Sequence, residues 1–182
     1  MCKAKLSSAT YLINSVKKYL TNEHLKILYY SLVYPYLDYG IMLWGSAAIT
    51  LRKPLITTQK KVIRVISNSS YNAHTTPLFK RNNILPIDDL YELQLAKFMF
   101  KYSRNELPTK LMQNFELNKD VHNHNTRHKN DPHIKHYNTR IFATTFLHIA
   151  PNLWLDIKQS IKNCNTCESF NRQYKKLLLN KY

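Results

Sequence analysis

Five of the chain's eight histidines lie within residues 121–140, VHNHNTRHKNDPHIKHYNTR. Imidazoles titrate near neutral pH and bind metals, so this segment is a candidate for general-base catalysis, metal binding or contact with an anion. Further along, Cys164 and Cys167 have the spacing with which two thiolates bind one zinc ion. The remaining two ligands could come from the five histidines of 121–140, His122 and His124 first among them. No second close pair of cysteines exists, so a zinc-binding module is an alternative and not the main interpretation.

Hydrolytic catalysis has less support, because the chain has neither a strand–Ser–turn signature nor a paired-carboxylate arrangement. Adjacent aspartates hold metals in nucleotidyl-transfer enzymes when they lie on a tight turn between strands. Here Asp88 and Asp89 lead into a helical pattern, which predicts that Asp88 is the N-cap and that Asp89 lies near the positive helix end. We therefore predict no catalytic residue and no small-molecule substrate.

The strongest pattern is basic and aromatic. The chain has 27 Lys+Arg against 11 Asp+Glu, a formal net charge of +16, and each half (to and after residue 91) carries +8. A body this basic attracts polyanions, of which nucleic acid is the commonest. The predicted phosphate-contacting residues are Lys60, Lys61, Arg64, Arg127, Lys129 and Arg140, with Tyr36 and Tyr39 lining a groove.

The elements that must position these residues are helical. Apolar periodicity predicts a helix over 6–20 that buries Leu12, Val16, Tyr19 and Leu20, and a second helix that Pro35 stops or kinks. A third helix over 51–68 is predicted to bury Leu51, Leu55, Val62 and Ile66. A short helix follows with Thr76 as cap and Pro77 in its first position, and another begins after Asp88. Residues 117–140 lack periodicity, and an amphipathic helix ends the chain, so the fold class is mainly α.

The cysteine content and the apolar stretches of the sequence bear on where the protein is located. Three cysteines do not make a disulfide framework, the N-terminal MCKAKLSSAT has no signal-peptide core, and the most apolar stretch (25–44) is interrupted by polar residues. These features predict an intracellular protein, nuclear or cytoplasmic, that is not secreted and does not enter a membrane.

Several stretches resemble a known family. LYYSLVYPYLDYGIMLWGSA (28–47), TTQKKVIRVISN (57–68), VHNHNTRHK (121–129) and APNLWLDIKQSIKN (150–163) are similar to the region after the polymerase core in jockey-like non-LTR retrotransposon reverse transcriptases. The resemblance implies a thumb-like helical region followed by a C-terminal extension. With the change in sequence character at 117–140, this predicts a helical, thumb-like domain over 1–116, a basic connector over 117–140 and a small helical segment over 141–182. It also implies RNA and DNA, as a primer–template duplex, and the polymerase's palm and fingers as partners.

In that family the catalytic aspartates lie upstream, in a Phe/Tyr-x-Asp-Asp turn of the palm that binds magnesium, and the 182 residues do not contain this motif. The resemblance therefore implies a non-catalytic C-terminal fragment of an RNA-directed DNA polymerase, with no cofactor in this chain. A zinc-binding interaction module and an inert helical relic stay open as alternatives.

Overall fold

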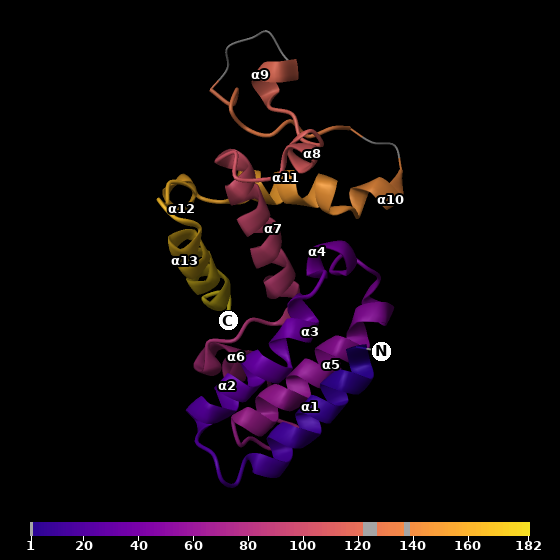
Figure 1. The fold of residues 1–182 in the computed structure, drawn as a ribbon, viewed down its shortest axis with the longest axis vertical. Coiled ribbons are helices and arrows are strands. Elements are labelled where there is room, and N and C mark those ends of the chain that lie inside the picture. Colours follow the sequence, from indigo (N-terminus) through magenta and orange to yellow (C-terminus); the bar gives the residue numbers. More distant parts are fainter. Residues whose placement is uncertain (1, 122–126, 137–138) are drawn as a thin grey trace. The chain divides into compact units, whose positions relative to one another are not determined.

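The computed structural model describes residues 2–121, 127–136 and 139–182, and these residues form thirteen helices and no sheet (Figure 1). The prediction of a mainly α fold is confirmed. One isolated antiparallel bridge joins Leu117 to Pro132. The helices are α1 (Cys2–Val16), α2 (Asn22–Leu32), α3 (Tyr34–Asp38), α4 (Ile41–Trp44), α5 (Ile49–Ile66), α6 (Thr76–Asn82), α7 (Ile87–Ser103), α8 (Thr109–Met112), α9 (Asn118–Val121), α10 (Arg140–Ala143), α11 (Phe146–Asp156), α12 (Gln159–Lys162) and α13 (Cys167–Leu179).

The helices belong to two compact units. The first contains the chain up to Tyr91 together with Lys175–Tyr182, and the second contains Glu92–Tyr174. The division predicted at residues 116 and 140 followed changes in sequence character, whereas these units are divided within α7 and within α13.

The first unit is built around α1 and α5, which lie side by side (Figure 1). The buried residues of α1 are Leu6, Ala9 and Ile13, spaced on one helical face, and those of α5 include Val62, Ile63 and Ile66. The face predicted for the first helix is wrong. Leu12 is half exposed, and the helix ends at Val16, so Tyr19 and Leu20 lie in the following turn and are also exposed.

The predicted inward face of α5 is correct for Val62 and Ile66 and wrong for Leu51, which is 71% exposed in the first turn of the helix. A buried amide fixes the middle of α5. Gln59 Nε2 donates to the Tyr29 hydroxyl at 3.0 Å and to the Leu85 carbonyl at 2.9 Å, and Gln59 Oε1 accepts from Ile87 N at 3.1 Å. Because the amide satisfies groups on three segments, it positions α5 relative to α2 and to the start of α7.

Proline and asparagine set several helix ends. As predicted, the helix stops before Pro35, which lies in the first turn of α3. Helix α6 begins at Thr76, so the cap is Thr75 and Pro77 is the second residue, one position from the prediction. The structure also places Asp88 inside the first turn of α7 and not before it, so Asp88 is not the N-cap.

Aromatic packing holds the second unit together. The Phe100 and Phe170 rings stack with centroids 4.6 Å apart, Phe170 and Tyr174 stack at 5.7 Å, and the Trp154 ring lies 6.0 Å from Phe170. Tyr174 donates a hydrogen bond to Glu92 at 2.8 Å. These contacts pack α7, α11 and α13 against one another within that unit.

Among the described residues, no helix combines the length and the apolar character that a membrane span requires.

Candidate nucleic-acid interface

A groove of about 780 Å³ lies along α1 and α5 in the first unit. The residues of α1 that line it recur at helical spacing, and so do those of α5, so each helix contributes one continuous face. The lining from α1 and its C-terminal turn is Ser7, Thr10, Tyr11, Asn14 and Lys17; the lining from α5 is Thr50, Lys53, Pro54, Thr57, Thr58, Lys61, Arg64 and Val65; and the α5–α6 loop adds Ser69 and Tyr71. The two helices therefore present hydroxyl, aromatic and cationic groups to one hollow.

The charged side chains that line the groove are all positive. Among the residues that the structure describes, the charged ones in its lining are Lys17, Lys53, Lys61 and Arg64, and none is a carboxylate. Within the described part of the chain, the three lysine ammonium groups make no ion pair and no hydrogen bond. Uncompensated ammonium groups that face a common hollow raise the local concentration of anions.

Arg64 has a second role in the groove. Its Nε donates to the carbonyl oxygen of Ala73 at 2.9 Å, which ties the α5–α6 loop to the helix. Tyr71 lies on this loop and is 76% exposed. Arg64 therefore contributes charge and also helps to place an aromatic ring at the edge of the groove.

The carboxylates of the first unit lie elsewhere. That unit has fifteen Lys+Arg and four Asp+Glu, a net +11, against twelve and seven, a net +5, in the second unit. Asp88 pairs with Arg52, and Asp89 accepts a hydrogen bond from the Tyr182 hydroxyl. Asp38 accepts a weak one from Tyr34 at 3.4 Å. These pairings are local to other parts of the unit and leave the groove cationic.

The structure separates the basic residues predicted on α5. Lys61 and Arg64 line the groove, whereas Lys60 is exposed on α5 outside it. The two predicted tyrosines also lie outside this groove. Tyr36 on α3 has the Lys5 ammonium 5.5 Å from its ring centroid, and Tyr39 follows α3 with 85% of its surface exposed.

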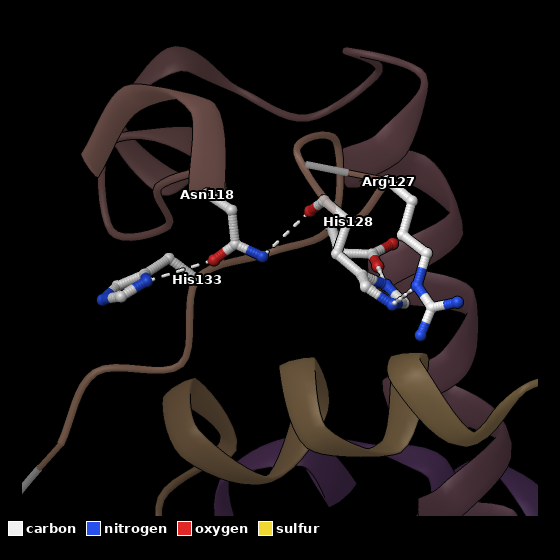
Figure 2. Close-up of polar contacts among 5 residues, drawn as sticks. Asn118, Arg127, His128 and His133 are labelled. Carbon is white, nitrogen blue, oxygen red and sulfur yellow. Dashed lines mark hydrogen bonds and ion pairs between the residues drawn. The ribbon is translucent and has the colours of Figure 1, made fainter. Parts of the chain in front are cut away.

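Arg127, Lys129 and Arg140 belong to the second unit, and their phosphate contacts stay a prediction. Figure 2 shows Arg127 beside His128, whose Nε2 accepts from the guanidinium Nε at 3.1 Å. The other ring nitrogen, Nδ1, lies 2.7 Å from an Asp131 carboxylate oxygen.

Asn118 connects two stretches of the chain on either side of this turn. Its Nδ2 donates to the His128 carbonyl at 2.9 Å, and its Oδ1 lies 3.2 Å from His133 Nδ1 (Figure 2). The Lys135 ammonium lies 2.8 Å from Glu116. His128 and His133 therefore hydrogen-bond to Asn, Asp and Arg side chains, and these contacts stabilise the turn around the Leu117–Pro132 bridge.

The structure describes only the two cysteines among the four residues named for zinc. Cys164 is buried, Cys167 is the first residue of α13, and His122 and His124 lie outside the described residues. Residues 2–121, 127–136 and 139–182 contain no group of three or more His, Cys, Asp or Glu side chains arranged for a metal ion.

Sequence reasoning missed Lys17, Lys53, Tyr11 and Tyr71. The positions of Lys53, Lys61 and Arg64 at i, i+8 and i+11 share a helix face, so the sequence did contain a signal for Lys53. Lys17, Tyr11 and Tyr71 join the groove only because α1 and the α5–α6 loop pack beside that face, which local sequence does not encode.

The chain matches no protein-family model, no curated protein and no solved structure. The support for a function therefore comes from the geometry and chemistry of the chain itself.

Proposed function

We propose that this chain binds nucleic acid through its phosphates, without strong sequence preference, at the groove along α1 and α5. The observation that carries the proposal is the lining itself, which has four cationic residues and no carboxylate. Lysine, arginine, serine and threonine are the residue types that contact phosphate and sugar, and such contacts carry no sequence information. Neutralising phosphates releases condensed counterions, so binding of this kind weakens steeply with salt.

The resemblance to non-LTR reverse transcriptases supports an RNA–DNA primer–template as the partner. On this proposal the chain contributes nucleic-acid binding to an RNA-directed DNA polymerase, and the polymerase's palm and fingers supply the chemistry. The missing Phe/Tyr-x-Asp-Asp motif agrees with a binding role.

A salt titration with matched variants tests the proposal. Fluorescence anisotropy of a labelled RNA–DNA hybrid that carries a single-stranded overhang measures the dissociation constant at a series of salt concentrations. For the unaltered protein we expect a linear fall of log affinity with log salt. In Lys61→Ala, which removes one phosphate contact, the slope should decrease by about one and the affinity at low salt should fall several-fold.

Lys60→Ala is the matched control, because Lys60 is the adjacent residue, has the same charge and lies outside the groove. It should leave the slope within error of the unaltered protein. Equal decreases in Lys60→Ala and Lys61→Ala would show that only net charge matters, and the groove would lose its role. Absence of binding at low salt by the folded protein would reject the function itself.

A further inference from the structure

Two exposed tyrosines line the cationic groove. Tyr11 lies in the middle of α1 and is 72% exposed, and Tyr71 lies in the α5–α6 loop and is 76% exposed. Within the described residues, neither ring stacks on another aromatic side chain and neither has a cation over its face. Both rings are therefore available to a ligand that occupies the groove.

Exposed aromatic rings beside ammonium groups suit single-stranded nucleic acid better than a duplex. The bases of a duplex are stacked on each other and present their edges, so a tyrosine ring beside the backbone has no base face to contact. A single strand offers unstacked bases, and each base that stacks on an aromatic ring adds affinity whatever its identity. We infer that the groove takes single-stranded nucleic acid, with its phosphates on Lys17, Lys53 and Lys61 and its bases on Tyr11 and Tyr71.

A second hollow extends the path of the strand. This hollow, of about 460 Å³, shares Lys17 and Val65 with the groove, also has Lys18 and Arg81 in its lining, and has no carboxylate. It lies at the C-terminal ends of α1 and α5, so the cationic surface continues beyond the groove. The face of α5 from Thr50 to Val65 is about 22 Å long at the α-helical rise, and the second hollow lengthens the track further. A strand that leaves the groove at Lys17 next meets Lys18 and Arg81.

This inference rests on the proposed function and specifies the part of a primer–template that the groove holds. A primer–template contains a duplex and a single-stranded overhang, and the groove takes the overhang. Arginine and lysine contacts to phosphate are common to both forms, so the tyrosines are the residues that distinguish them.

The test compares two probes and two classes of variant by anisotropy at one low salt concentration. The probes are a labelled single-stranded RNA of about 12 nucleotides, within the range of known single-strand sites, and the same RNA annealed to complementary DNA as a blunt hybrid. We expect the single strand to bind at least about tenfold more tightly than the hybrid. Tyr11→Ala and Tyr71→Ala should each weaken single-strand binding about tenfold and leave hybrid binding unchanged, as expected for one lost stacking contact.

The chain provides matched controls. Tyr11→Phe and Tyr71→Phe keep the ring and should bind the single strand like the unaltered protein. Tyr19 and Tyr39 are 84% and 85% exposed and lie outside both hollows, so Tyr19→Ala and Tyr39→Ala should have no effect.

Equal affinity for the two probes, or full single-strand binding by Tyr11→Ala and Tyr71→Ala, overturns the inference. If the hybrid then still binds and Lys61→Ala weakens it, phosphate binding at the groove stands and only the single-strand preference fails. If neither probe binds, both the inference and the proposed function fail.

Discussion

At the scale of single residues, a buried hydrogen-bonded amide holds α5 in place, and α5 is the helix that contributes most of the groove lining. Gln59 is nearly inaccessible, and its amide bonds to Tyr29, Leu85 and Ile87. A buried amide that loses these partners would leave unsatisfied groups on three segments, at a cost of about 1–3 kcal/mol for each. The three groove lysines are the opposite case, because their ammonium groups have no partner within the described residues.

Tyr29 makes the stability of the fold sensitive to alkaline pH. Burial raises the pKa of its hydroxyl well above the ordinary value of 10.0, and the hydrogen bond from Gln59 offsets only part of this effect. The folded state therefore keeps a proton that the unfolded state loses, so the contribution is fully present below pH 10 and is lost as the pH rises above it. We expect the free energy of unfolding to fall above about pH 10, with Tyr29 contributing up to about 1.4 kcal/mol per pH unit.

The variant Tyr29→Phe tests this linkage by urea denaturation over a series of alkaline pH values. It should lose about 1 kcal/mol at neutral pH, because a hydrogen bond is removed, and it should show a shallower decline above pH 10. Tyr71→Phe, at an exposed position, should decline like the unaltered protein. An unchanged alkaline decline in Tyr29→Phe would contradict the assignment.

At the scale of the elements, a chain with only 2 Gly ends three of its helices with a left-handed asparagine. Asn68, Asn83 and Asn105 all have positive φ (48°, 57° and 58°), and they follow α5, α6 and α7 respectively. Asparagine tolerates the left-handed region because its short amide bonds locally, so it replaces glycine at these C-terminal positions. The loop after Asn68 contains Tyr71, so this helix end also helps to place a groove residue.

Gly45 is required because a side chain there has no room, and not because of its backbone angle. Gly45 has helical φ of −63°, but a Cβ atom there would lie against the Tyr91 ring and 2.6 Å from the Ile41 carbonyl oxygen. We therefore expect Gly45→Ala to lower the free energy of unfolding by about 1–3 kcal/mol, measured by urea denaturation, because the surrounding backbone must shift.

Gly40 provides the comparison for that substitution. It lies in the left-handed region with φ of 63°, and a Cβ there would make an ordinary contact with Trp44 at 3.8 Å. Because asparagine is among the residues that tolerate this region, Gly40→Asn should lower the free energy of unfolding by no more than about 1 kcal/mol, less than Gly45→Ala. A Gly45→Ala protein as stable as the unaltered one would show that α4 and Tyr91 do not pack as described.

At the scale of the whole molecule, charge is unevenly divided, with +11 on the first unit and +5 on the second. The sequence divided at residue 91 shows +8 on each side, because Lys175, Lys176 and Lys181 join the first unit only through the fold. The unit that contains the groove therefore carries most of the excess, which favours its approach to polyanions.

The sequence predicted the helical class and the break at Pro35, and two of the residues that it singled out for phosphate contact, Lys61 and Arg64, line the groove. These follow from local composition and periodicity. It did not predict the buried face of α1. Two different sets of apolar residues have helical spacing there, and the structure buries Leu6 and Ile13 and exposes Leu12. Tyr19 lies beyond the end of the helix at Val16. It also could not place Tyr71 beside α5, because that proximity arises from tertiary packing.

The most direct test of the groove is lysine protection by bound RNA. The protein is treated with an acetylating reagent with and without saturating single-stranded RNA, and mass spectrometry measures the reaction rate of each lysine. The account predicts that RNA protects Lys17, Lys53 and Lys61 while Lys60, the exposed residue beside Lys61, reacts at its free rate. Protection of Lys60 equal to that of Lys61, or unchanged rates at Lys17, Lys53 and Lys61 in the complex, would contradict it.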